Sequence, residues 1–353
     1  MLSSRNSMLE LRCTPGRNNL RPGPTFKFYI LKTDVPLNLI FGYPNVYFDS
    51  ASEYNLSSVH ERVYINNLTC ELERILKAEF FDFDFYFLFA HNSMVTPSSL
   101  RIQRRNKILI WFGDESGHFP ARLSDHYRVI FKSYITKEDG NIYLNPVGYI
   151  NEFNRVTPGS VKKDIKVFFS GNLNSNRLGL YRMLLLRKGR FMLFFNLIPR
   201  RLSLKLLRKF KHRMKTNLGN HEFVFLFSHR WKSGLEYQKY QNYLVRSTFS
   251  LCPKGFYSSE TFRHLESMNA GCIVISEKMP EVLIYRDHPF LIYNNLQELE
   301  EILRKIERSE FNEPDLIQRH QLYYQKFFTM SAIASRIAEI CLTYKNVAGK
   351  VAS

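Results

Sequence analysis

Short apolar runs that alternate with helical segments constrain the second half of this chain more than any other feature. Branched and aromatic residues bounded by turn formers predict strands over 165–169, 222–227, 248–252, 272–276 and 289–293. Helical spacing fills the gaps, over 235–245, 259–269 and 296–307. Strands that alternate with helices form parallel sheets covered on both faces. The pattern therefore predicts an α/β domain.

The first half shows a similar but less regular pattern. Strand-like runs lie at 26–31, 37–41, 83–90, 107–112 and 128–134, and residues 59–78 have a helical period. A chain of 353 residues is long enough for two compact domains, and the turn-rich stretch 151–163 is a plausible linker. We predict a flexible lead-in over 1–24, α/β domains over 25–155 and 156–315, and a C-terminal helical segment, 316–353, that can cross back to the first domain.

The charge of the chain points to an anionic partner. Lys and Arg outnumber Asp and Glu by 50 to 32, which gives a formal net charge of +18. Nucleic acid, an acidic membrane surface and phosphorylated small molecules are the classes that fit. Residues 179–217 hold 12 of these bases and no acid, interleaved with apolar residues at helical spacing. Such a segment suits an anionic membrane surface. It equally suits contact with nucleic acid, or a solvated basic helix whose apolar face lies in the core.

Other classes are disfavoured by what the sequence lacks. No run of 18 apolar residues occurs, so a transmembrane helix is not expected, and the first residues do not resemble a secretory signal. The five cysteines are widely spaced and form no CxxC pair. That disfavours a disulfide framework and a structural zinc site. We expect a reducing, cytoplasmic location, with peripheral membrane binding as a hypothesis.

The stretch from strand 248–252 through a Pro-Lys-Gly loop to the next helix is the richest in candidate binding residues. Ligands of α/β sheets bind beyond the carboxyl ends of strands, and a helix N-terminus there attracts phosphate. We predict that Ser258 or Ser259 caps the helix, that Lys254 and Arg263 bind a pyrophosphate and that Glu266 binds a ribose. A surface helix with an Arg–Glu pair is the alternative. The candidates of this stretch are Lys254, Ser259, Glu260, Arg263 and Glu266.

A second candidate site follows strand 165–169. Gly171 allows close approach of a phosphate to the backbone. Asn172 can donate hydrogen bonds, and Arg177 can make a bidentate phosphate contact. An ordinary turn with an Asn cap is the alternative.

A third candidate site follows strand 107–112, which ends in two carboxylates and a histidine. Transfer of a group to a hydroxyl with inversion needs one general base. Glu115 is the predicted base and Asp114 the alternative, while His118 could tune or replace either. A helix cap would also account for these residues.

The loop and helix together resemble the nucleotide-binding signature of exostosin-like glycosyltransferases of the GT-B fold. Cys252-Pro253-Lys254-Gly255 matches that family's Cys-Pro-Arg-Gly loop with Lys for Arg, and Ala270-Gly271-Cys272 matches its closing turn. Arg263 and Glu266 match the family's Arg and Glu. Ser258 departs from the many GT-B enzymes that carry a first glutamate there.

The other two sites show a secondary likeness to α-1,3-fucosyltransferases. The Gly171-Asn172 turn with Arg177 is similar to the turn that opens their C-terminal domain. Glu115-Ser116 resembles their Glu-Ser-Pro turn, with Gly117 in place of Pro, which places Glu115 in register with the family's acceptor-domain glutamate.

The resemblance implies two Rossmann-like domains that face a central cleft, with the acceptor and base on the first and the donor on the second. The expected activity is transfer of a hexosyl or pentosyl group from a nucleotide-diphosphate sugar to a hydroxyl of a glycan or lipid-linked acceptor. It implies inversion without a metal, and we expect no cofactor. The alternatives are a basic nucleic-acid-binding protein, although no nucleic-acid motif occurs, and an inactive nucleotide-sugar-binding protein.

Asp82-Phe83-Asp84 matches the Asp-x-Asp motif of metal-dependent GT-A glycosyltransferases. There the motif should close a strand, whereas here it precedes the apolar run of residues 85–90. We therefore expect no metal site at these carboxylates.

Overall fold

The computed structural model describes residues 37–39, 42–59, 61–92, 94–104, 106–148, 161–186, 213–218, 221–228 and 234–351. The predicted lead-in over 1–24, the strand over 26–31, most of the linker over 151–163 and most of the basic segment over 179–217 lie outside these residues.

The first domain is built on a six-stranded sheet whose strands lie in chain order. They are β1 (Leu37–Leu39), β2 (Val46–Asp49), β3 (Asp84–Phe89), β4 (Lys107–Phe112), β5 (Val129–Lys132) and β6 (Ile142–Leu144). β2 to β6 are parallel, and only β1 runs antiparallel to its neighbour. Every residue of β4 is buried, as expected for a central strand covered on both faces.

The second domain has a six-stranded sheet in the order β12-β11-β10-β7-β9-β8. The strands are β7 (Ile165–Asn172), β8 (Arg213–Leu218), β9 (His221–Ser228), β10 (Ser247–Cys252), β11 (Ile273–Glu277) and β12 (Leu291–Tyr293). All are parallel except β8, which is antiparallel to β9. After β7 the chain forms β8 and β9 on one side of that strand, and then β10, β11 and β12 on the other side. Such a reversal leaves a crevice at the carboxyl ends of the two strands.

Helices cover both sheets. The α-helices are α1 (Arg62–Leu76), α2 (Leu178–Leu186), α5 (Tyr237–Val245), α6 (Phe262–Asn269), α7 (Leu296–Glu307), α8 (Glu313–Phe327) and α9 (Met330–Val351). Short 3-10 helices are η1 (Leu56–Ser58), η2 (Lys77–Asp82), η3 (Ser98–Arg101), η4 (Ala121–His126) and η6 (Leu283–Tyr285). These elements confirm the predicted pair of parallel-sheet α/β domains.

The start of α6 differs from the prediction. Thr261, in an extended conformation, caps the helix, and its side chain and that of His264 bond reciprocally to each other's backbone. The Ser258 hydroxyl instead accepts a hydrogen bond from the Glu260 amide, 3.1 Å away, in the preceding turn. The helix therefore begins at Phe262, and the predicted capping by Ser258 or Ser259 is wrong because the loop uses its serine before the helix starts.

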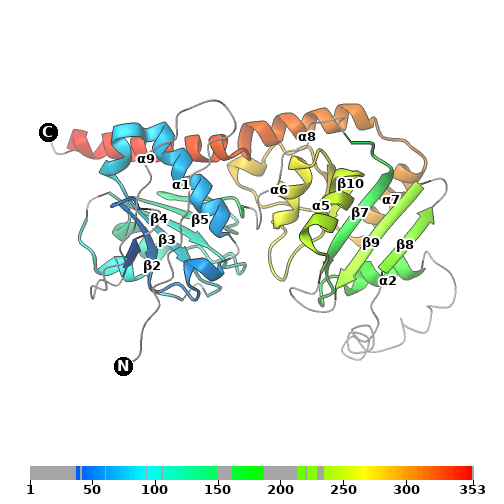
Figure 1. The fold of residues 1–353 in the computed structure, drawn as a ribbon, viewed down its shortest axis with the longest axis horizontal. Coiled ribbons are helices and arrows are strands. Elements are labelled where there is room, and N and C mark those ends of the chain that lie inside the picture. The colour runs from blue at the N-terminus through cyan, green and yellow to red at the C-terminus, as the bar shows by residue number, and fades with distance from the viewer. Residues whose placement is uncertain are drawn as a thin grey trace, which may run out of the picture.

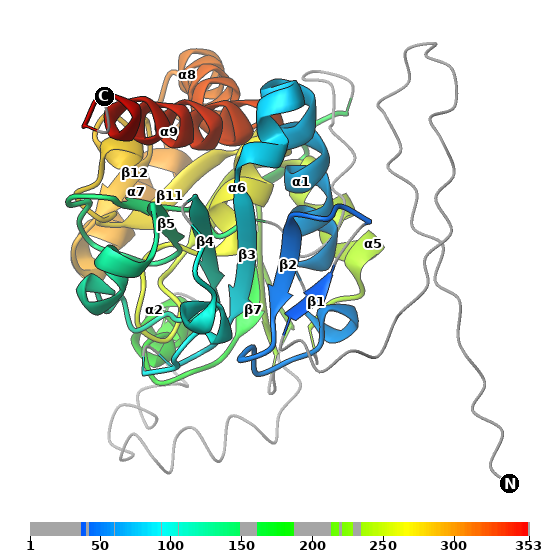
Figure 2. The same cartoon turned by 90° about the vertical axis from the view of Figure 1, so that its left-hand side faces the viewer.

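The two domains lie side by side along the long axis of the molecule, and the last two helices run along one edge of both (Figure 1). α8 lies over the second domain, whereas α9 returns over the first, where it lies beside α1 (Figure 2). Ile333 and Ile337 of α9 are buried in the same apolar cluster as Leu68 and Leu72 of α1. The sequence predicted one helix here. The break follows Phe328, where the Thr329 hydroxyl accepts from the Ala332 amide and starts a new helix.

An apolar cluster continues from one domain to the other. It includes Trp111 and Ile135 on the first side and Leu265, Met279 and Phe328 on the second. Burial of such surface stabilises by about 25 cal/mol per Å². The cluster holds the two domains together.

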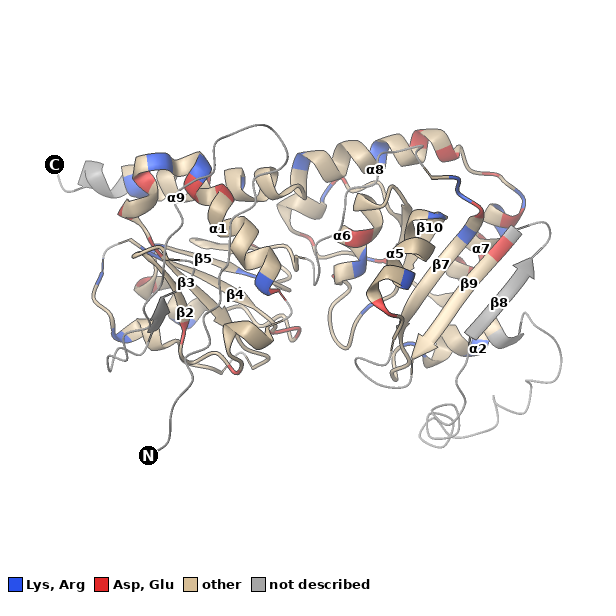
Figure 3. Ribbon diagram, viewed as in Figure 1, with Lys and Arg blue, Asp and Glu red and all other residues tan. Residues whose placement is uncertain are grey.

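Charged residues are scattered over the helices and loops of both domains (Figure 3). Among the described helices, none combines the length and the apolar character that crossing a bilayer requires. Cys252, Cys272 and Cys341 are free thiols, whereas Cys70 of α1 is disulfide-bonded. Cys70 therefore takes part in a disulfide, which the spacing of the cysteines along the chain does not reveal.

Candidate active site

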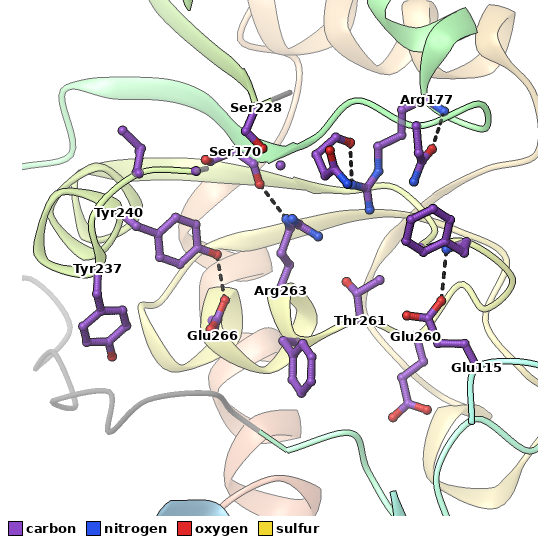
Figure 4. A pocket seen from close by; sticks show the side chains of 18 of the residues that line it. Glu115, Ser170, Arg177, Ser228, Tyr237, Tyr240, Glu260, Thr261, Arg263 and Glu266 are labelled. Carbon is purple, nitrogen blue, oxygen red and sulfur yellow. Dashed lines mark hydrogen bonds between the residues drawn. The ribbon is translucent and has the colours of Figure 1, made fainter. Parts of the chain in front are cut away.

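A pocket of ≈ 370 Å³ opens at the carboxyl ends of β7 and β10. It lies at the point where the strand order of the second sheet reverses, which is the expected ligand crevice of such a sheet. The first domain contributes Glu115 and Tyr134 to its wall, and the second domain contributes the rest. Figure 4 shows Tyr237 and Tyr240 at one end, Arg263 in the middle, and Arg177 and Glu115 toward the other end.

Two arginines converge on Gly171, the glycine near the end of β7. A Cβ atom at Gly171 would lie 2.7 Å from Nη2 of Arg263 and 3.2 Å from Nη1 of Arg177. Both guanidinium groups also pack on the Phe169 ring. Their Cζ atoms lie 5.5 Å (Arg263) and 5.7 Å (Arg177) from the centroid of the ring. Only glycine leaves room for both cations here, so the backbone and the two arginines form one unit.

Hydrogen bonds to backbone carbonyls hold these arginines in place. Arg177 is 4% exposed and donates to the carbonyls of Asn172, at 2.9 Å, and Lys254, at 3.0 Å. Arg263 Nε donates to the Ser170 carbonyl at 2.7 Å. Burial, together with the charge of Arg263, lowers the pKa of Arg177 to about 9.

Neither arginine forms an ion pair with a carboxylate of the described residues. A buried cation such as Arg177, next to the partly buried Arg263, is costly without a counterion. An anionic ligand compensates the pair best when it can accept several N–H groups. The arrangement therefore fits a phosphate or diphosphate.

Glu266 of α6 faces the same pocket from below the arginines (Figure 4). Glu266 is 7% exposed, and its carboxylate accepts a hydrogen bond from the Tyr240 hydroxyl at 2.8 Å. Burial raises its pKa to about 7, opposed by Tyr240 and Arg263. A carboxylate with free lone pairs can accept hydrogen bonds from a pair of hydroxyl groups. Leu235 and Tyr237 line the same pocket and provide apolar surface beside it.

Glu115 approaches the pocket from the first domain. It lies in a turn after β4 that is bounded by Gly113 and Gly117, both with positive φ, at 96° and 72°. Its Oε2 accepts a hydrogen bond from the Phe256 amide at 3.0 Å. A Cβ at Gly255 would lie 2.9 Å from the same oxygen. The glycine therefore lets the loop after β10 close onto the carboxylate.

The other two candidates of this turn lie outside the pocket. Asp114 is fully buried and pairs with Lys132 of β5, Oδ2 to Nζ 3.0 Å. Its other oxygen accepts from the Ser116 amide at 3.1 Å, so the side chain fixes the turn. His118 is exposed and its Nδ1 contacts the Ser116 hydroxyl. Of the three candidate bases, the structure brings Glu115 alone to the pocket.

Lys254 and Ser259 do not line the pocket, although both were predicted for the donor site. The amide of Lys254 donates to Glu277 at 3.2 Å, and its Nζ lies 3.8 Å from the same carboxylate. The side chain therefore points to the end of β11, and the Lys254 carbonyl accepts hydrogen bonds from Arg177. The role predicted for this lysine in donor binding stays a prediction.

Glu260 lines the pocket but makes its hydrogen bonds to neighbouring protein groups. Its Oε1 accepts from the Val147 amide of the first domain at 3.1 Å and from the Tyr285 hydroxyl at 2.8 Å. Burial raises its pKa to about 7, opposed by these donors. These bonds give Glu260 a part in joining the domains as well as a place in the wall.

Several wall residues were not predicted. Ser170 and Ser228 lie at the carboxyl ends of β7 and β9, and that position alone would have indicated them. Tyr134 has a positive φ of 66°, a strained conformation for a side chain of this size, and carries no sequence signal. Tyr240 belongs to α5, whose sequence pattern shows a helix but does not distinguish a ligand-binding residue.

The Asp-x-Asp residues lie at the amino end of β3, at the opposite end of the strands from Glu115. Asp84 begins β3 and pairs with Arg104, and Asp82 pairs with Lys345 at 2.7 Å. Across the part of the chain that the structure describes, no three His, Cys, Asp or Glu side chains are grouped as a metal site requires.

Comparison with known proteins gives distant structural similarities only among solved structures. No family model and no curated protein matches the chain. Among solved structures, the chain is similar to a DNA-modifying β-glucosyltransferase, determined with and without its substrate uridine diphosphoglucose. The identity is 11% and the TM-score 0.37, over 85% of this chain and 98% of that chain. At these values the similarity carries no argument about activity.

The architecture itself defines the class of fold. Two α/β domains with parallel sheets face each other, a pocket lies between them, and the C-terminal helix returns to the first domain. This is the GT-B fold, which confirms the fold class predicted from the sequence. The closer resemblances to exostosin-like enzymes and fucosyltransferases stay predictions.

Proposed function

We propose that the protein is a glycosyltransferase that uses a nucleotide-diphosphate sugar. The observation that carries the proposal is the pair of arginines around Gly171, the buried Arg177 and the partly buried Arg263. Neither has a carboxylate partner among the described residues, and both lie beside the Glu266 carboxylate. This combination matches the two polar parts of such a donor, a diphosphate and a ribose. The sequence likeness of the same loop and helix to exostosin-like enzymes points the same way.

The donor would lie along the pocket. The diphosphate binds Arg177 and Arg263, the ribose hydroxyls bind Glu266, and the base lies toward Leu235 and Tyr237. Asn172 and the glycine backbone of β7 add polar contacts near the phosphates. The sugar then projects toward the first domain, where Glu115 lies.

Glu115 would act as the general base. It takes the proton of the acceptor hydroxyl while the oxygen attacks the anomeric carbon of the donor. The bond from that carbon to the diphosphate oxygen breaks, and its electron pair leaves with the diphosphate. Arg177 and Arg263 stabilise the charge that develops there, which is the task a metal ion performs in other enzymes. Attack opposite the leaving group inverts the anomeric carbon. We assign no cofactor.

The acceptor is a hydroxyl of a glycan or of a lipid-linked sugar. The basic segment over residues 179–217 supports a peripheral contact with anionic membrane, because its bases are interleaved with apolar residues. The same charge would also suit nucleic acid, which remains the alternative function, together with an inactive nucleotide-sugar-binding protein.

A thermal-shift panel tests the donor site. The shift in Tm caused by UDP, GDP, ADP or a single-stranded oligonucleotide is measured for wild type and for Arg263→Met. Arg304→Met is the surface control, because Arg304 is half exposed and pairs with Glu300. Stabilisation by one diphosphate, lost only in Arg263→Met, supports the proposal. Stabilisation by the oligonucleotide alone favours the nucleic-acid-binding protein. Diphosphate binding without sugar transfer to a panel of acceptors favours the inactive protein.

A further inference from the structure

The loop after β10 exposes two aromatic rings at the edge of the pocket. Phe256 is 49% exposed and Tyr257 is 76% exposed. Phe256 also lines the pocket, and its amide holds Glu115. Burial of apolar rings stabilises a protein, yet this loop leaves two adjacent rings largely uncovered. Exposed apolar groups that gather in this way mark binding surfaces.

The backbone of this loop is held in place, so the exposure belongs to the fold. The Gly255 amide donates to the Ser258 carbonyl at 2.9 Å. Nδ2 of Asn176 donates to the carbonyls of Gly255, at 3.1 Å, and Phe256, at 2.6 Å. The second domain therefore presents both rings on a backbone that is bonded on two sides.

The first domain places further rings on its side of Glu115. Tyr54 is 45% exposed, and its ring meets Phe89 and His91 edge to face, with centroids 5.4 and 5.8 Å apart. Nδ1 of His91 lies 2.9 Å from the carbonyl of Gly113, the residue that begins the Glu115 turn. We call the four side chains of Tyr54, His91, Phe256 and Tyr257 the aromatic rim. The rim thus has members in both domains: the Phe256 amide is bonded to Glu115, and His91 contacts the turn that carries Glu115.

We propose that the aromatic rim binds the sugar rings of a saccharide acceptor, an inference that rests on the proposed function. The C–H face of a pyranose stacks on an aromatic ring while its hydroxyl groups stay hydrated. A half-exposed ring of Tyr or His offers such a face and a polar edge. Sugars bound along the rim would bring one hydroxyl to Glu115.

The charges beside the rim favour a saccharide over nucleic acid. Binding of a single strand requires cations along the backbone in addition to stacked bases. Apart from the two arginines of the donor pocket, the charged groups next to the rim residues are the carboxylates of Glu53, adjacent to Tyr54 in the chain, and Glu115. Lys254, next to the loop, already contacts Glu277. A neutral saccharide suits this mixture of rings and carboxylates.

Substitutions in the rim test the proposal with a matched control. Tyr257→Ala and Tyr54→Ala remove rim rings, Tyr257→Phe keeps the ring, and Phe81→Ala removes a 54% exposed ring on η2, in the segment before β3. Each protein is applied, with saturating nucleoside diphosphate, to a printed array of neutral oligosaccharides. A 20-nucleotide single-stranded DNA and phosphatidylglycerol vesicles are tested in parallel.

We expect wild type, Tyr257→Phe and Phe81→Ala to bind the same oligosaccharides with similar affinity. Tyr257→Ala and Tyr54→Ala should each weaken that binding by about tenfold, which corresponds to about 1.4 kcal/mol, while the Kd of the diphosphate stays unchanged. Unaltered saccharide binding in both alanine variants would overturn the inference, as would no saccharide binding by wild type. A rim-dependent affinity for DNA or vesicles would overturn it too. Failure of wild type to bind any diphosphate would instead refute the proposed function.

Discussion

The carboxylate of Glu115 and the amide of Phe256 lie 3.0 Å apart and belong to different domains. Glu260 makes the reverse connection, from the second domain to the Val147 amide of the first, at 3.1 Å. Two carboxylates thus cross the cleft in opposite directions. Because of this, the position of the candidate base relative to the arginines depends on how the domains are docked.

Arg263→Met should weaken diphosphate binding and leave the fold intact. Methionine keeps apolar contact with Phe169 but removes a charge-assisted hydrogen-bond donor, which is worth about 1.5–3 kcal/mol, or roughly tenfold or more in Kd. Isothermal titration with the diphosphate that stabilises wild type measures the change. Arg304→Met should bind as wild type does. Equal affinity in both variants would remove Arg263 from the donor site.

Gly171→Ala should also weaken diphosphate binding, because it displaces Arg263 rather than removing it. The added Cβ would lie 2.7 Å from Nη2 of Arg263, so the guanidinium must move. Gly234→Ala is the control, since Gly234 also lines the pocket but a Cβ there meets nothing within 4 Å. We expect at least a tenfold loss of diphosphate affinity for the first and little change for the second. A Gly171→Ala protein with wild-type affinity would show that the arginines do not need their present positions.

Glu115→Gln should reduce turnover by about 10²–10⁴-fold without changing donor affinity, because the amide keeps the shape but cannot accept a proton. Initial rates with a fixed donor and acceptor measure the loss. Asp114→Asn and His118→Asn are assayed beside it. If Glu115→Gln stays fully active while His118→Asn fails, the base is His118. If all three stay active, the base lies elsewhere.

Lys132→Met should destabilise the protein, because it removes the cation that pairs with Asp114 and leaves that carboxylate buried without a charge partner. Removal of one member of a buried pair costs about 3–5 kcal/mol. The double variant Lys132→Met/Asp114→Asn should recover much of that loss. Urea unfolding compares the three proteins. Since Asp114 fixes the turn of Glu115, the double variant should also show a lower kcat with an unchanged KM for the donor. Identical stability of wild type and the single variant would contradict the pairing.

Glu266→Gln should change how stability depends on pH. Burial raises the pKa of Glu266 to about 7, so between about pH 4.5 and 7 the folded protein binds a proton that the unfolded chain has lost. The contribution of this carboxyl is therefore fully present below pH 4.5 and is lost as pH rises through 7. Relative to the glutamine variant, wild type should lose about 3 kcal/mol over this interval. Urea unfolding at pH 5 and pH 8 measures the difference. A constant difference would show that the carboxyl ionises freely in the fold.

The sequence predicts five of the six described strands of the second sheet, because these are apolar runs bounded by turn formers. β8 was missed because polar and basic residues interrupt it. β2 and β6 were missed because runs of four and three residues show no period. The site was partly predictable for a related reason. Residues at the ends of predicted strands, such as Gly171 and Glu115, must lie at the sheet edge where ligands bind.

Other parts of the site depend on contacts that adjacent residues do not reveal. Asp114 and Glu115 are neighbours in one turn, yet one faces Lys132 and the other faces the cleft. Lys254 is directed by Glu277, 23 residues away along the chain. Tyr240 reaches the pocket only because α5 lies beside β7.

The break between α8 and α9 has a mechanical consequence. The chain passes from one domain to the other after Gly148 and again at Phe328–Thr329, so the domains are tethered at two points. Domain hinges are a few loop or element-terminal residues, and Phe328–Thr329, between two helices, is such a position for a rotation of one domain against the other. Such a rotation would separate Glu115 from Phe256, and Glu260 from Val147, in a single swing. Product could then leave without unfolding of either sheet.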